Sequence, residues 1–185
     1  MVESLKARLQ ISASMLSLIW VIFLIEAIIP GLELRSWGIL PRDPSGLFPG
    51  VIAAPLLHGG LWHLVANSIP LFVLSFLVSL HGTGRLIRVS IAVTLLGGLL
   101  VWVFGRNAYH IGASGLIFGL WAYLLAYGYV KCDLKAIAIA IAVLVLYGGM
   151  AFGLLLGTPG VSIESHLFGA LIGALCAVKD GRSKK

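Results

Sequence analysis

Long stretches without a single Asp, Glu, Lys or Arg are the feature that most constrains how this chain can fold. The longest of them cover residues 9–25, 44–84, 89–105, 107–130, 136–163 and 165–178. A helix that crosses a membrane needs about 20 mostly apolar residues. Only 11% of the 185 residues are charged and 59% are hydrophobic, whereas about 25% of residues are charged in soluble domains. These values exclude a soluble enzyme, a disordered chain and a disulfide scaffold, and they predict a membrane protein.

Helix-breaking residues decide how the longest uncharged stretch is divided. Its first part, up to Gly60, is rich in proline and glycine and is therefore expected to be a loop. The sequence then predicts a single all-α domain over residues 1–185 with six membrane spans. We expect these spans near residues 11–29, 61–80, 86–104, 115–131, 135–153 and 163–179. The first apolar stretch is longer than the roughly 7–15 residues of a signal peptide, so we expect it to remain as a helix.

The distribution of basic residues predicts how the chain is oriented. Ten of the thirteen Lys and Arg lie at the termini and in the second and fourth loops: Lys6, Arg8, Arg85, Arg88, Lys131, Lys135, Lys179, Arg182, Lys184 and Lys185. Because cytoplasmic loops collect Lys and Arg, both termini are expected in the cytoplasm and the 31–60 loop on the outer side. This first loop is expected to be a compact structure at the membrane interface. No basic stripe interleaved with aromatic residues is present, so nucleic acid is not an expected partner.

The first polar motif at membrane depth is Gly112-Ala113-Ser114-Gly115, at the start of the fourth expected span. The flanking glycines leave the serine hydroxyl uncrowded. A helix that begins here places Ser114 at the positive end of the helix dipole, where an oxyanion is stabilised. The alternative is a helix-packing site, because Gly115 and Gly119 form a GxxxG pair.

A second motif opens the last expected span, where His166, Gly169 and Gly173 share one helix face. Close packing of this face on Gly115 and Gly119 would bring His166 within hydrogen-bond reach of Ser114. A nucleophile and its general base require this arrangement. A histidine that is hydrogen-bonded to a neighbouring carbonyl is the alternative.

The third motif is His63 and Asn67, which lie four residues apart and so on one helix face at the start of the second expected span. Both side chains can donate hydrogen bonds without carrying a formal charge, as the stabilisation of a developing oxyanion requires. A helix cap or an interhelical hydrogen bond is the alternative. His58 lies nearby, but no HExxH motif accompanies it, so neither a metal nor another cofactor is predicted. All three motifs are expected at one membrane depth.

Together these motifs resemble the rhomboid family of intramembrane serine proteases. The resemblance covers about residues 31 to 178 and rests on residues 63–67, 112–115 and 166–173, with further similarity at residues 37–42 and 147–150. It implies a compact bacterial type of six-helix bundle with a structured first loop. One departure is that residues 81–85 lack the glutamate that many members carry after the second span, which leaves open how this loop is tethered.

The resemblance also implies a role for each residue of the site. Ser114 would be the nucleophile and His166 its general base, without a third carboxylate. The side chains of His63 and Asn67, with the Ser114 backbone N–H, would form the oxyanion hole. Phe118 would lie against the catalytic histidine.

The expected function is hydrolysis of peptide bonds in or near transmembrane segments of membrane proteins. The partners would be transmembrane protein substrates and the lipid bilayer, and the location a bacterial inner membrane with the site toward the outer face. The fifth span, with Gly148, Gly149 and Gly153 near its outer end, would admit the substrate laterally. The alternative is a catalytically inactive rhomboid relative, or another six-helix protein, that binds transmembrane clients.

Overall fold

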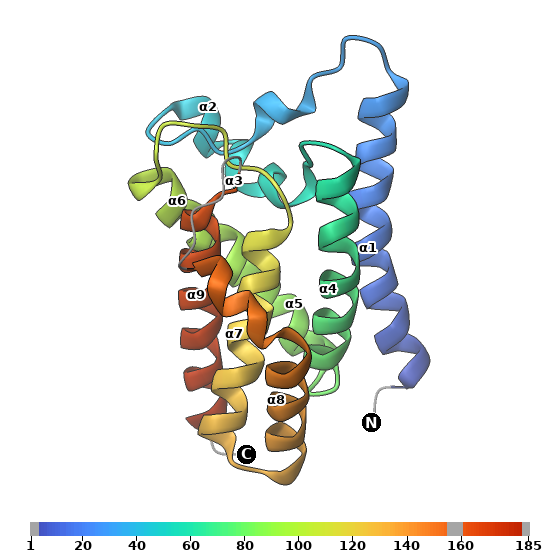
Figure 1. Ribbon diagram of the computed structural model, residues 1–185, viewed down its shortest axis with the longest axis vertical. Helices are drawn as coiled ribbons and strands as arrows, with labels where there is room; N and C mark the ends of the chain where they lie inside the picture. Colours follow the sequence, from blue (N-terminus) through green and yellow to red (C-terminus); the bar gives the residue numbers. More distant parts are fainter. Residues whose placement is uncertain (1–3, 155–160, 183–185) are drawn as a thin grey trace.

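The computed structural model describes residues 4–154 and 161–182, and their regular structure is helical apart from a single bridge between Ile39 and His110. Long helices run side by side, and α1 begins at the end of the bundle where α9 ends (Figure 1). The α-helices are α1 (Leu5–Ile28), α2 (Pro44–Leu47), α3 (Gly50–Ala53), α4 (Leu61–Ser79), α5 (Thr83–Ala92), α6 (Gly98–Phe104), α7 (Ser114–Lys131), α8 (Leu134–Tyr147) and α9 (Ile163–Arg182). Three 3₁₀ segments, η1 (Leu34–Trp37), η2 (Ala54–Leu56) and η4 (Gly148–Leu154), and one π-helical segment, η3 (Val93–Gly97), complete the list.

Among the described residues, four helical segments are long and apolar enough to cross a membrane. They are Leu5–Ile28, Leu61–Ser79, Thr83–Phe104 and Leu134–Leu154. The other two long helices, α7 and α9, are not in this group, and α7 lies in the middle of the bundle (Figure 1). Because neighbouring helices cover α7, its surface need not be uniformly apolar. The all-helical class is thus established, whereas the crossing of a membrane by all six segments stays a prediction.

The first helix begins earlier than the sequence predicted, at Leu5 instead of near residue 11. The Ser4 side chain caps it by accepting a 3.2 Å hydrogen bond from the backbone N–H of Ala7. Lys6 and Arg8 are good helix formers. Their charges therefore mark the end of the apolar stretch but do not end the helix. Lys184 and Lys185, which the orientation argument counted, lie outside the described residues.

Glycines bring α7 and α9 into direct backbone contact. A Cβ atom at Gly169 would collide with the carbonyl oxygen of Gly115, and one at Gly173 would collide with that of Gly119. On α7, a Cβ at Gly119 would lie 2.6 Å from the side chain of Val93 in η3. The structure therefore brings together the two glycine faces that the sequence predicted to pack against each other.

The first loop is folded against the segment that connects α6 to α7. Ile39 and His110 exchange backbone hydrogen bonds of 3.1 and 2.8 Å. The indole N–H of Trp102 in α6 donates a 2.8 Å hydrogen bond to the carbonyl of Asp43. The Arg42 guanidinium donates to the carbonyls of Val103 and Gly105 at the C-terminal end of α6. These bonds hold the loop over the end of the bundle at which α7 begins.

An ionic cluster around Asp180 ties the opposite end of the bundle together. The Asp180 carboxylate accepts two 3.1 Å hydrogen bonds from Arg88 of α5 and forms a 3.2 Å ion pair with Arg85. The hydroxyl of Tyr123 on α7 donates a third bond of 3.0 Å to it. Residues 81–85, which follow α4, contain no carboxylate. Asp180 of α9 supplies one to Arg85 and Arg88 instead.

We expect Gly173→Ala to destabilise the protein by about 1–3 kcal/mol, because an added methyl group at a close contact forces the helices apart. Gly84→Ala is the matched control, since no atom lies within 4 Å of a Cβ at that position in α5. Its expected effect is neutral or stabilising by up to about 1 kcal/mol. Thermal unfolding in detergent micelles measures both changes, and equal effects would contradict the packing described.

Candidate active site

One cavity of about 560 Å³ is lined by residues from α4, α7 and α9. It contains all four polar residues that the sequence singled out at membrane depth, namely His63, Asn67, Ser114 and His166. The rest of its wall is mostly apolar and consists of Gly59, Ala66, Pro70, Ile111, Ile117, Phe118, Met150, Val161 and Ser162. An apolar cavity with a few convergent polar groups is the usual form of a small binding or catalytic site.

Ser114 is the first residue of α7 and is half-buried at the cavity wall. The backbone reaches it through Gly112, whose φ of +115° lies in the region that favours glycine. The Gly112 N–H donates a 2.8 Å hydrogen bond to the carbonyl of Ala54, which fixes this turn against η2. The first N–H groups of a helix have no acceptor within the helix. The Ser114 N–H, at the first position of α7, is therefore not needed for a hydrogen bond within the helix.

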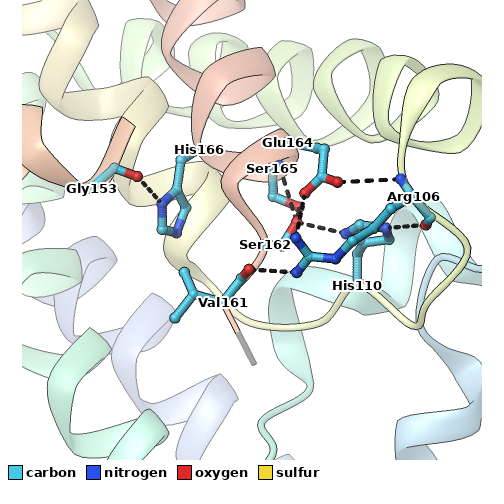
Figure 2. Close-up of polar contacts among 8 residues, drawn as sticks. All are labelled: Arg106, His110, Gly153, Val161, Ser162, Glu164, Ser165 and His166. Carbon is cyan, nitrogen blue, oxygen red and sulfur yellow. Dashed lines mark hydrogen bonds and ion pairs between the residues drawn. The ribbon is translucent and has the colours of Figure 1, made fainter. Parts of the chain in front are cut away.

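The imidazole of His166 is buried and held from two directions. Its Nδ1 lies 3.0 Å from the carbonyl oxygen of Gly153 in η4 (Figure 2). Its ring stacks on Phe118 with a centroid distance of 4.0 Å and an interplanar angle of 14°. Because a carbonyl can only accept, Nδ1 carries the proton and Nε2 of the neutral ring keeps a lone pair. This is the form that a general base requires.

His63 and Asn67 present hydrogen-bond donors to the turn before Ser114. His63 Nδ1 accepts a 3.3 Å hydrogen bond from the backbone N–H of Gly59, so Nε2 of the neutral ring carries the proton. A Cβ at Gly112 would lie 2.6 Å from this Nε2 and 3.6 Å from Asn67 Nδ2. Asn67 is buried, and its Nδ2 has no partner among the described residues. An unpaired buried donor is costly, so this point is suited to an acceptor supplied by a ligand.

The nucleophile candidate and the base candidate share the cavity without a direct hydrogen bond between them among the described residues. Such bonds are often long in unliganded sites and shorten when substrate binds. Their relative position therefore depends on the scaffold around them.

A second polar cluster, centred on His110 and Ser162, was not predicted from the sequence. His110 precedes Ser114 by four residues, and Ser162 precedes His166 by four. The available signals were weak: the chain has only five histidines, and a serine ahead of Glu164 is typical of a helix start. Glu164 itself pairs with Arg106 at 3.5 Å, whereas the hydrogen-bond partner of His166 Nδ1 is the Gly153 carbonyl.

The remaining histidine near the site is His58. It is buried in the loop before α4, and its ring meets that of His63 edge-on at 5.1 Å. Burial, with a smaller contribution from His63, lowers the pKa of His58 to about 4, so the ring is neutral at pH 7. In the part of the chain that the structure describes, no three His, Cys, Asp or Glu side chains gather as metal ligands.

Comparison with known proteins assigns the chain to a family. Residues 47–183 match the Rhomboid domain, so the chain belongs to the rhomboid family, whose members are generally intramembrane serine proteases. Together with the four apolar helices, this membership makes the chain an integral membrane protein.

Its relatives come from several kinds of organism. An uncharacterized protein of Mycobacterium tuberculosis is 41% identical over 175 residues, which cover 89% of this chain and 72% of that protein. YdcA of Bacillus subtilis, named provisionally as a rhomboid protease, is 29% identical over 140 residues, or 71% of this chain and 69% of that protein. RHOMBOID-like protein 4 of Arabidopsis thaliana is 28% identical over 125 residues, or 64% of this chain and 30% of that protein.

We expect Gly112→Ala to lower the free energy of unfolding by about 1–3 kcal/mol, because alanine is strained at a positive φ. The new methyl group would also displace the His63 ring. Gly60→Ala is a suitable control, since the φ of Gly60 is 164°, which is extended backbone, and a Cβ there meets nothing within 4 Å. Unfolding monitored by circular dichroism in detergent compares the two. A Gly112→Ala protein as stable as Gly60→Ala would contradict the backbone conformation described for this turn.

Proposed function

We propose that this chain is an intramembrane serine endopeptidase that hydrolyses peptide bonds in or near transmembrane segments of other membrane proteins. The observation that carries the proposal is the cavity in which Ser114, His166, His63 and Asn67 meet. The side chains of His166, His63 and Asn67 each have the hydrogen-bonding form that the proposed role requires. His166 keeps a lone pair on Nε2, His63 keeps a proton on its own Nε2, and Asn67 keeps an unpaired N–H.

In the first half of the reaction, Ser114 Oγ attacks the carbonyl carbon of the scissile peptide bond, and His166 Nε2 takes the hydroxyl proton. The carbonyl oxygen becomes an oxyanion, which accepts hydrogen bonds from His63 Nε2–H, Asn67 Nδ2–H and the Ser114 N–H. The C–N bond then breaks as His166 returns the proton to the leaving amine. In the second half, water attacks the acyl-enzyme with His166 again as the base, which releases the new carboxylate and restores Ser114.

The dyad functions without a third carboxylate because other groups orient the imidazole. In a serine triad the carboxylate fixes the tautomer and orientation of the histidine. Here the Gly153 carbonyl fixes the tautomer, and the stacked ring of Phe118 fixes the plane. A neutral carbonyl also avoids placing another formal charge at membrane depth.

We further propose that the substrate enters laterally between α4 and α8. The 3₁₀ segment η4 follows α8, and its Met150 lines the cavity. A helical substrate hides its carbonyls in intrahelical hydrogen bonds, so it must unwind before attack. Helix-destabilising residues near the cleaved bond and a small residue before it are therefore expected. The site would face the outer side of a bacterial inner membrane, with both termini cytoplasmic.

The test is cleavage of a transmembrane substrate in liposomes, combined with labelling by a fluorophosphonate that reacts with activated serines. Ser114→Ala should abolish both signals, and His166→Ala should lower both by about 10³-fold or more. Asn67→Ala should lower kcat by about 10²–10³-fold, as loss of an oxyanion donor does. Ser17→Ala, on an exposed face of α1, should retain wild-type activity.

Labelling or cleavage that persists in Ser114→Ala would refute the proposal. A wild-type protein that folds, binds transmembrane peptides and neither labels nor cleaves would instead support the inactive, client-binding alternative.

A further inference from the structure

The polar cluster around His110 joins three parts of the fold (Figure 2). His110 lies between α6 and α7 and is almost fully buried, with 1% of its surface exposed. Its backbone pairs with Ile39 of the first loop. Its side chain reaches Ser162, which lies 52 residues further along the chain at the start of α9. A buried side chain with this reach fixes the relative positions of the segments that it contacts.

The hydrogen bonds of the His110 ring define its protonation. Nε2 lies 3.0 Å from the carbonyl oxygen of Arg106, and Nδ1 lies 2.6 Å from the Ser162 hydroxyl oxygen. The carbonyl can only accept, so Nε2 carries a proton. Burial lowers the pKa of His110, against smaller opposing effects of the Arg106 carbonyl and Glu164, so the ring is neutral at pH 7. Nδ1 is then the acceptor that the ring offers to the Ser162 hydroxyl. The Ser165 hydroxyl oxygen lies 2.7 Å from the Ser162 hydroxyl oxygen, and Ser165 is the donor of that pair when the Ser162 proton is directed to His110.

Ser162 occupies the N-cap of the helix that carries His166. Its hydroxyl oxygen accepts a 3.1 Å hydrogen bond from the Ser165 N–H, and its carbonyl accepts one of 3.3 Å from the His166 N–H. An N-cap side chain satisfies the free N–H groups of the first helical turn and so fixes where the helix begins. The Ser162 hydroxyl therefore connects His110 directly to the first turn of α9, in which His166 lies.

A second connection runs parallel to the first. Arg106 donates hydrogen bonds through its guanidinium to the Val161 carbonyl and through its backbone N–H to Glu164, at 2.5 and 3.2 Å. Arg106 and Glu164 are partly exposed, and pairs of this kind are screened and weak. The buried contact between His110 and Ser162 is the better defined of the two.

We propose that His110 is a positioning residue that sets the separation of the nucleophile and the general base through the Ser162 hydroxyl. This inference rests on the proposed protease function. His110 lies four residues before Ser114, and Ser162 lies four residues before His166. One hydrogen bond thus links the segment that carries Ser114 to the segment that carries His166. Among the described residues Ser114 and His166 share no direct hydrogen bond, so their alignment depends on links of this kind.

Two amide substitutions at His110 separate this role from simple packing. The side-chain oxygen of asparagine can replace Nδ1, so His110→Asn keeps the contact with Ser162. The amide nitrogen of glutamine can replace Nε2, so His110→Gln keeps the contact with Arg106 and loses the one with Ser162. We expect His110→Asn to retain kcat within about 3-fold, and His110→Gln to lose at least about 10-fold with KM within about 2-fold. The rate of fluorophosphonate labelling at Ser114 should follow kcat.

Equal kcat values in the two His110 variants, or a loss confined to KM, would overturn the proposal.

If neither variant folds in detergent, a second pair of variants at Ser162 tests the proposal. Ser162→Thr keeps the hydroxyl and should retain kcat, whereas Ser162→Ala should lose at least about 10-fold. Ser4→Ala removes the corresponding N-cap hydroxyl of α1 and should leave kcat unchanged. Equal kcat values for Ser162→Thr and Ser162→Ala would also refute the positioning role of His110.

The outcomes distinguish this inference from the proposed function. A wild-type protein without labelling and cleavage refutes the protease function, and the positioning role falls with it. An active wild type whose activity depends on Ser114 and His166, but not on the contact between His110 and Ser162, refutes the positioning role alone.

Discussion

The direct backbone contact between α7 and α9 is the interaction on which the rest of the structure depends. In a membrane the hydrophobic effect adds little to helix association, so close van der Waals packing at small residues becomes important. Gly169 and Gly173 lie against the carbonyls of Gly115 and Gly119. Ser114 directly precedes one side of this contact, and His166 lies three residues before the other. The packing therefore brings a hydroxyl and an imidazole to the wall of one cavity.

This arrangement places polar groups within an apolar bundle, where each needs a partner or a function. The structure provides partners from the backbone: the Gly153 carbonyl for His166, the Gly59 N–H for His63 and the Arg106 carbonyl for His110. Charged side chains gather toward the two ends of the bundle, as in the Asp180 cluster. The buried donor of Asn67 remains unpaired in the described structure, which agrees with a site that binds an acceptor in use.

Much of this organisation could be predicted because so few polar residues occur at membrane depth. The packing of the glycine faces of α7 and α9 was predicted from helical spacing. The four polar residues of the cavity were singled out by this spacing together with the Gly112–Gly115 motif and their expected place at membrane depth. The bond between His110 and Ser162 could not be predicted, because it joins residues 52 apart through a connector without periodicity. The Asp180 cluster joins residues up to 95 apart in sequence, such as Arg85 and Asp180. The uncharged stretches also did not separate α7 and α9 from the four helical segments of the described chain that are long and apolar enough to cross a membrane.

In the proposed mechanism, Ser114 attacks a carbonyl whose oxygen is then held by His63 and Asn67. An experimental structure of the protein after reaction with a fluorophosphonate tests this most directly. This mechanism predicts a covalent bond between phosphorus and Ser114 Oγ, with the phosphoryl oxygen about 3 Å from His63 Nε2, Asn67 Nδ2 and the Ser114 N–H. Modification of another residue, or a phosphoryl oxygen that points away from His63 and Asn67, would contradict it.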